Sequence, residues 1–173
     1  MKENNFSDFI ANVEPTEYAI CVNEIWLDLC KFNDFAQFKA VVLDLCGNNA
    51  NVHFEDFRGI PNEMFEKFKV DAEECFDDFV QYEMSDNETK RAYKHYLEYV
   101  SSYAYGCFED FTEKYQGYFA TETEFAEHFV DEIGLLDGVD SNLAMYFDYA
   151  AYARDLFLNG DFVYCNGYVF SRN

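Results

Sequence analysis

The segment TETEFAEHFVDEIG, residues 121–134, contains a complete helix signal. Thr121, with Glu124 three residues later, has the form of a capping box, in which both side chains satisfy free N–H groups at the start of a helix. Apolar residues then recur at three- and four-residue steps from Phe125 to Ile133, which is typical of a helix that buries one face. The other face is mostly Glu and Asp. The segment therefore predicts a helix with an apolar face toward a core and an acidic face toward solvent.

Strand signals lie on both sides of this helix. Residues 162–165 and 168–170 are rich in Phe, Val and Tyr and flank Asn166-Gly167, the strongest short signal for a β-hairpin. Residues 108–120 alternate loosely and predict a further sheet-like stretch, and residues 142–158 predict a second helix. Together these elements predict that residues 106–173 form a C-terminal α+β unit.

The N-terminal part has a similar mixture of signals. Residues 17–22 and 25–29 are strand-like and are joined by Asn23-Glu24, which predicts a hairpin. Residues 34–46 have helical spacing and end at Gly47, and residues 52–57 predict a third strand. Residues 16–61 therefore predict a ββαβ unit. The preceding residues 1–15 are polar without periodicity, and we expect them to be a flexible extension.

Between these two units the pattern is purely helical. Residues 62–105 have breaks at Val70-Asp71 and near Ser85-Asp86, which predict three short helices with too little material for a core of their own. The predicted fold class is thus α+β, with a small mixed α/β unit, a central helical unit and a second mixed α/β unit.

Composition restricts the classes of function. Among 173 residues, 34 Asp and Glu stand against 12 Lys and Arg, which gives a net charge of −22. Direct binding to nucleic acid or to an anionic membrane surface is excluded, because both require clustered cations. The 50% hydrophobic content, with 20% aromatic residues, predicts a folded chain rather than a disordered acidic one.

The cysteines and the N-terminus indicate the compartment. The six cysteines form no CxxC pair and no zinc-ligand spacing with histidine, so we interpret them as buried thiols in a reducing compartment. The N-terminus has no signal-peptide pattern, and the chain has no apolar run of 18 residues. We therefore expect a cytoplasmic protein.

Motifs that carry catalysis are missing. The sequence contains no dinucleotide fingerprint, P-loop, zinc-protease, EF-hand or nucleophile-elbow pattern, and its three histidines lie in different segments. Carboxylates are so abundant that pairs of them cannot identify a catalytic dyad. We therefore predict no catalytic residue, no metal site and no cofactor, while a carboxylate enzyme or a Ca²⁺ or Mg²⁺ binder stays open as the weakest alternative.

The placement of the acidic residues is the most informative feature. Glu73, Glu74 and Asp77 share one predicted helix, so like charges stand three and four residues apart, which mildly destabilises a helix. Similar groups recur along the central and C-terminal parts, with few lysines near them. We call the following residues the acidic surface: Asp71, Glu73, Glu74, Asp77, Asp78, Glu83, Asp86, Glu88, Glu98, Glu109, Asp110, Glu113, Glu122, Glu124, Glu127, Asp131 and Glu132.

Two interpretations compete for the acidic surface. The first is a solvated face kept for solubility or for high salt. Against it, high-salt proteins usually shed bulky apolar residues whereas this chain has 20 Phe, and the acids are spread along the chain rather than gathered in a tail. The second is an electrostatic copy of a nucleic acid. Duplex DNA carries one charge per roughly 1.7 Å, so 22 net charges match about 37 Å, or roughly 11 base pairs per chain.

A family resemblance favours the second interpretation. The string LLDGVDSNLAMYFD, residues 135–148, resembles the antirestriction motif shared by Ard proteins, and the surrounding chain is similar to the ArdA family. Further matching strings occur in the same order from about residue 16 to the end, namely IWLD (25–28), FEDFRGIP (54–61), YQGYF (115–119), YFDY (146–149), ARDL (153–156) and YVF (168–170).

The resemblance implies an elongated three-unit protein that dimerises through its C-terminal unit and mimics bent B-form DNA. Its implied partner is a type I restriction-modification enzyme, with DNA-specificity and methyltransferase subunits, whose DNA-binding groove it occupies to protect incoming mobile DNA. It implies no catalysis. The motif and probable dimer interface would comprise Leu135, Leu136, Asp137, Val139, Asp140, Leu143, Met145, Tyr146, Phe147 and Asp148.

This chain also departs from the family pattern. The connection Asn23-Glu24 is shorter than usual, so the first hairpin is expected to differ, and Arg58 stands where an acid is common. Within the motif, Asp137, Asp140 and Asp148 are either contacts or helix caps. The alternative function is an acidic adaptor that binds a basic DNA-binding protein other than a restriction enzyme.

Overall fold

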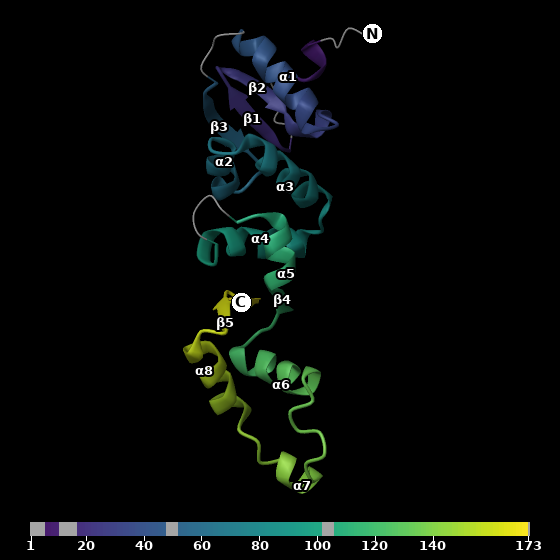
Figure 1. Cartoon of the computed structure of the whole chain (residues 1–173), viewed down its shortest axis with the longest axis vertical. Coiled ribbons are helices and arrows are strands. Elements are labelled where there is room, and N and C mark those ends of the chain that lie inside the picture. Colours follow the sequence, from purple (N-terminus) through teal and green to yellow (C-terminus); the bar gives the residue numbers. More distant parts are fainter. Residues whose placement is uncertain (1–5, 11–16, 48–51, 102–105, 173) are drawn as a thin grey trace. The chain divides into compact units, whose positions relative to one another are not determined.

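The computed structural model describes residues 6–10, 17–47, 52–101 and 106–172, and these form two compact units (Figure 1). Within the described residues, the first unit runs to Lys90 and includes residues 106–108. The second unit comprises residues 91–101 and 109–172. Each unit has its own three-stranded antiparallel sheet with helices packed on it, which confirms the predicted α+β class. The finer division into three units, with boundaries at residues 61 and 105, stays a prediction.

The sheet of the first unit is built around a short hairpin. Strands β1 (Ala19–Val22) and β2 (Ile25–Asp28) pair directly, and β3 (Phe54–Arg58) pairs with the other edge of β1, giving the order β2-β1-β3. Asn23 and Glu24 form the turn with φ of 47° and 67°, the left-handed conformation that two-residue hairpin turns require. The predicted hairpin and third strand are confirmed.

Three helices cover this sheet: α1 (Phe35–Cys46), α2 (Asn62–Phe68) and α3 (Ala72–Met84). Asp34 starts α1 by accepting a 2.8 Å hydrogen bond from the Gln37 N–H. Aromatic rings join the helices, since Phe38 lies 6.1 Å from Phe68 and 5.5 Å from Phe76 between ring centroids. The next helix, α4 (Asn87–Tyr99), has residues in both units, and the predicted breaks between these helices are confirmed.

Part of the predicted flexible extension is instead packed on the first sheet. The short 3₁₀ helix η1 (Phe6–Asp8) leads to Phe9, which is buried and stacks on Phe32 at 4.8 Å. The Asp28 N–H donates a 3.1 Å hydrogen bond to the Phe9 carbonyl oxygen. Burial of the apolar Phe9 ring favours packing of residues 6–10 on the sheet, although the segment around it is polar. The rest of the extension, residues 1–5 and 11–15, lies outside the described residues.

The second unit repeats the mixed architecture. Strands β4 (Tyr115–Tyr118), β5 (Phe162–Cys165) and β6 (Tyr168–Ser171) form an antiparallel sheet in the order β4-β6-β5, and the predicted hairpin at Asn166-Gly167 is confirmed. Helices α6 (Glu122–Glu132) and α8 (Tyr149–Asn159) pack against each other and against the sheet. Their shared core is Phe125, Ala126, Ala153, Leu156 and Val169.

Two predicted elements of this unit were wrong in type or extent. Residues 108–114, expected to be sheet-like, form helix α5 (Phe108–Lys114) directly before β4. The packing of Phe111 accounts for the helix. Its buried ring lies 5.2 Å from the Tyr93 ring and 5.8 Å from the Tyr96 ring between centroids, and the loose alternation in the sequence did not reveal these contacts. The single helix expected over residues 142–158 is divided into α7 (Ser141–Ala144) and α8. Asp148 starts the second of these by capping it.

Candidate functional site

The acidic surface lies almost entirely in solvent. All its members are exposed except Asp110, which is half-buried, and Asp78. Helices α3 and α6 carry most of the charge, with five acids each and no Lys or Arg in either helix. Acids four residues apart on such a helix are separated by about 6 Å along its axis. Each helix therefore presents several negative charges to solvent, and some of them, such as Glu73 and Asp77 on α3 or Glu127 and Asp131 on α6, stand four residues apart.

Local helix energetics explain the acids at the N-terminal ends. The Asp71 side chain caps α3 by accepting a 3.1 Å hydrogen bond from the Glu74 N–H. Glu122 and Glu124 lie in the first turn of α6, where the helix dipole favours negative charge. Glu124 also accepts a 2.7 Å hydrogen bond from the Ala120 N–H. These carboxylates stabilise the fold whatever else they do.

The acids at the C-terminal ends have no such local explanation. Asp131 and Glu132 end α6, Glu83 lies in the last turn of α3, and Glu98 lies in the last turn of α4. None of these three helices has a basic residue in its last turn. Negative charge is unfavourable at this end of a helix, where Lys or Arg would stabilise it. The placement costs stability, which points to a function for the charge itself.

Asp78 was wrongly assigned to the acidic surface. It is 3% exposed, and its Oδ2 accepts a 2.7 Å hydrogen bond from the Lys67 ammonium, itself 2% exposed. Its Oδ1 accepts a further bond of 2.9 Å from the Phe108 N–H. The Lys67 ammonium also reaches Glu74 at 3.3 Å. Asp78 therefore ties α2, α3 and residues 106–108 together inside the first unit.

Lys67 is consequently a structural cation rather than a surface one. Burial alone lowers the pKa of Lys67, but the hydrogen bond and the negative charge of Asp78 outweigh burial, so this pKa lies above its ordinary value. One of the 12 basic side chains is thus turned inward and paired. It also pairs with the exposed Glu74, so it offsets part of the charge of the acidic surface from inside the unit.

Cys30 lies where partial burial and nearby acids both disfavour a thiolate. The pKa of this thiol is raised to about 11, first by partial burial and then by the charges of Asp28, Glu83 and Glu17, with Lys90 acting in the opposite sense. All six cysteines are free thiols, but the expectation that they are buried holds only for Cys21 and Cys75. Cys30 is exposed, and the other three, Cys46, Cys107 and Cys165, are half-buried.

The motif at residues 135–148 presents apolar side chains to solvent. Leu143, Met145 and Tyr146 are 67%, 80% and 85% exposed, and α7 has no buried residue. Leu135 and Val139 are exposed as well, whereas Leu136 and Phe147 are half-buried. We call the exposed residues Leu135, Val139, Leu143, Met145 and Tyr146 the apolar patch. Large exposed apolar side chains that gather in one segment mark an interaction site.

The structure separates the roles of the three aspartates in the motif. Asp140 accepts a 2.9 Å hydrogen bond from the Asn142 N–H at the start of α7, and Asp148 accepts one of 2.9 Å from the Ala151 N–H at the start of α8. Both are helix caps, and both remain exposed. Asp137 is exposed and ends a turn, in which its own N–H donates a hydrogen bond to the Gly134 carbonyl oxygen.

Sequence reasoning also missed part of the apolar surface. Ile133 and Leu158 were assigned to helical stretches with a buried face, yet they are 50% and 77% exposed. Each stands at or beside the end of its helix, where a periodic pattern no longer guarantees burial.

Arg58 is one of the positions at which this chain departs from the family pattern. Its guanidinium stacks over the Trp26 ring at 4.8 Å.

A metal centre and a membrane span have geometric requirements of their own. In the part of the chain that the structure describes, no three His, Cys, Asp or Glu side chains gather in a way that could hold a metal ion. None of the described helices is long and apolar enough to cross a membrane.

Comparison with known proteins adds one finding. A family model described as "Antirestriction protein (ArdA)" matches residues 11–170, nearly the whole chain. No curated protein matches this chain. The match confirms the resemblance carried by the motif at residues 135–148, and it extends over both units.

Proposed function

The chain belongs to the ArdA family of antirestriction proteins, and on this basis we propose that it inhibits type I restriction-modification enzymes by mimicking B-form DNA. Its carboxylates would take the place of phosphates in the DNA-binding groove formed by the specificity and methyltransferase subunits. The main support is the presence of acids at the C-terminal ends of α3, α4 and α6, where negative charge costs stability.

The proposed binding follows from charge and spacing. Phosphates on one DNA strand rise by about 3.4 Å per nucleotide. Acids at i and i+4 of a helix are about 6 Å apart along its axis. Two such carboxylates would therefore occupy roughly every second phosphate site of a DNA-binding groove. Arginines of such a groove can bind carboxylates in the same bidentate manner as phosphates. Many weak charged contacts, rather than one dominant residue, would share the binding energy.

We further propose that the protein acts as a homodimer joined through the apolar patch. Leu143, Met145 and Tyr146 are too exposed to stabilise their own unit, and a second copy would remove them from water. Joining two chains would double the length of duplex that is mimicked, from about 11 to about 22 base pairs by net charge. That length suits the footprint of a large DNA-processing enzyme.

This activity is inhibition rather than catalysis. The protein would act at one dimer per binding groove, in the cytoplasm where restriction enzymes meet incoming DNA, and would protect a plasmid or transposon during its entry. The charge of −22 supports this arrangement because it speeds encounter with a basic groove and repels DNA itself.

A competition titration tests the proposal. A purified type I methyltransferase core is placed on a fluorescent duplex that carries its recognition site, and this protein is added. We expect displacement at stoichiometric concentration, with an affinity that falls steeply as salt increases. A folded domain of similar charge, unrelated in sequence, is the control. Equal and weak competition by both would contradict DNA mimicry and favour the adaptor that binds another basic protein.

A further inference from the structure

A cavity of about 520 Å³ lies in the first unit, lined by residues of α1, of β3 with the segment before it, and of the α2–α3 connection. This volume lies within the range of roughly 300–1,000 Å³ that is usual for small-molecule sites. No member of the acidic surface lines it. A ligand bound in this cavity would therefore not contact the acidic surface through the lining residues.

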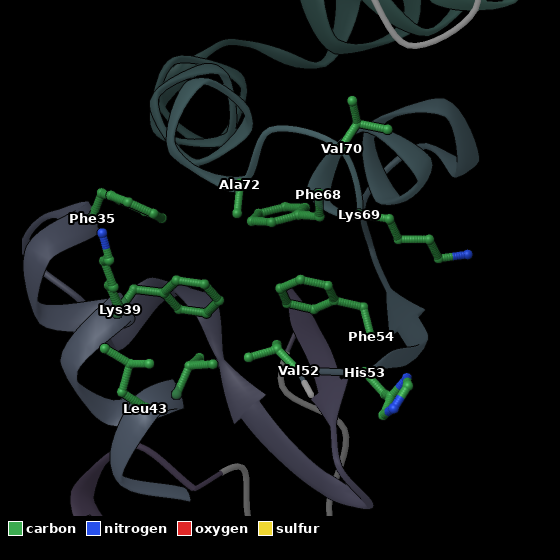
Figure 2. A pocket seen from close by; sticks show the side chains of 12 residues that line it. Phe35, Lys39, Leu43, Val52, His53, Phe54, Phe68, Lys69, Val70 and Ala72 are labelled. Atoms are coloured by element: carbon green, nitrogen blue, oxygen red, sulfur yellow. The ribbon is translucent and has the colours of Figure 1, made fainter. Parts of the chain in front are cut away.

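The walls of the cavity are aromatic. Phe38 and Phe68 are each 1% exposed, with ring centroids 6.1 Å apart, and the Phe54 ring lies 6.0 Å from that of Phe68. Figure 2 shows the Phe54 and Phe68 rings bordering the hollow, with Ala72 beside them. Phe38 and Phe68 are packed against their neighbours, so the half-buried rings of Phe35 and Phe54 are the aromatic lining that a ligand can contact.

The rim of the cavity is apolar as well. Leu43, Val52 and Val70 line it and are 45%, 37% and 69% exposed. Apolar side chains around a hollow mark a binding site for an apolar group. A ligand seated there would remove both the walls and the rim from water.

One cation stands at this rim. The Lys39 ammonium lies 5.9 Å from the centre of the Phe35 ring, and no carboxylate pairs with it within residues 6–10, 17–47, 52–101 and 106–172. Lys69 also lines the cavity but extends away from it and bonds Glu66 at 2.7 Å. The Lys39 ammonium is therefore available to an anionic group of a ligand at this rim.

We infer that this cavity binds a single-chain apolar carboxylate of the medium-chain fatty acid class. The tail lies in the hollow against the half-buried Phe54 ring and the apolar rim, and the carboxylate lies beside the Lys39 ammonium. Charge complementarity selects this class. A cationic amphiphile would bring its charge against Lys39, and a small hydrophilic anion would leave the aromatic walls uncovered.

Calorimetric titration of the full chain with decanoate, below its micelle concentration, tests the inference. We expect one decanoate per chain. Affinity should rise about fourfold per methylene from octanoate to decanoate, as burial of apolar surface requires. Decyltrimethylammonium should bind more weakly than decanoate. The absence of saturable decanoate binding, or tighter binding of the cationic probe, would overturn the inference.

Two pairs of variants locate the site. Lys39→Met should lower decanoate affinity roughly two- to fivefold, as for a solvent-exposed ion pair, while decanol binding stays unchanged. Lys94→Met, an exposed lysine of α4, should change neither. Ala72→Phe should fill the cavity and abolish binding of both probes, whereas Ala40→Phe on the exposed face of α1 should not. Equal effects of Lys39→Met and Lys94→Met, or full binding by a folded Ala72→Phe variant, would refute the site.

Discussion

At the scale of single residues, partial burial and neighbouring acids together raise the pKa of the Cys30 thiol. Because its pKa is about 11, only about one thiol in a thousand is ionised at pH 8, and the thiolate is the reactive form. We expect iodoacetamide to alkylate the exposed Cys30 far more slowly than free cysteine at pH 8, and faster as the pH approaches 11. Mass spectrometry of the peptide that contains Cys30 measures this rate.

The matched variants for Cys30 are Glu83→Gln and Glu73→Gln, both on α3. Glu83 contributes to the raised pKa of Cys30, so its neutralisation should lower that pKa and speed alkylation at pH 8. Glu73→Gln removes the same charge from the same helix and should have a smaller effect. Rapid alkylation of the unmodified protein at pH 8 would show that burial and the nearby acids do not raise the pKa of Cys30 as the structure indicates.

The second prediction at this scale concerns the buried pair. Asp78→Ala leaves the Lys67 ammonium buried without its main partner, and breaking such a pair typically costs about 3–5 kcal/mol. Asp77→Ala, one residue away and exposed, should stay within about 0.5 kcal/mol of the unmodified protein. Urea denaturation followed by circular dichroism measures both. Equal midpoints for the two variants would contradict the buried role of Asp78.

The same pair has a pH signature. The pKa of Lys67 is raised in the folded protein, so its contribution to stability is fully present below the ordinary value of 10.5 and is lost as the pH rises through the folded value. The stability difference between the unmodified protein and Lys67→Met should therefore stay constant from pH 7 to 9. It should shrink only in strongly alkaline solution.

At the scale of elements, α6 allows stability and function to be separated. Asp131→Lys places a cation at the C-terminal end of the helix and should stabilise the protein by about 0.3–1 kcal/mol. Glu122→Lys makes the same charge change in the first turn and should destabilise it by a similar amount. Under DNA mimicry, both variants should inhibit restriction less well.

Thermal unfolding and the DNA competition assay, applied to both α6 variants, give the two readouts. If inhibition followed stability instead, Asp131→Lys would improve it and Glu122→Lys would impair it. That outcome would mean that the acids of α6 act through folding alone. Opposite shifts in unfolding temperature with parallel losses of inhibition would assign the charge to binding.

The elements also show where sequence reasoning succeeds. The hairpin at Asn166-Gly167 and the helix starting after Thr121 were predictable because turn and cap chemistry is local. The helix at 108–114 was not, because Phe111 packs against rings of α4 that are distant in sequence. The burial of Asp78 was missed for the same reason, since its partner Lys67 lies on another helix. Long-range partners leave no local pattern.

At the scale of the whole molecule, the proposed dimer through the apolar patch would set the length of duplex that is mimicked. If two chains join there, the double variant Met145→Asp and Tyr146→Asp should place charges in the interface and yield monomers. Sedimentation equilibrium should then show half the mass of the unmodified protein. Val80→Asp adds a charge at an exposed apolar position of α3, outside the patch, and should leave the mass unchanged.

The monomer gives a quantitative test of mimicry itself. The slope of log affinity against log salt is proportional to the number of charged contacts that replace phosphates. A monomer of the double variant presents half the carboxylates of a dimer, so its slope in the competition assay should fall to about half, and its affinity should fall with it. A halved mass with an unchanged slope would mean that one chain supplies every contact, and that the second copy adds no length to the mimic.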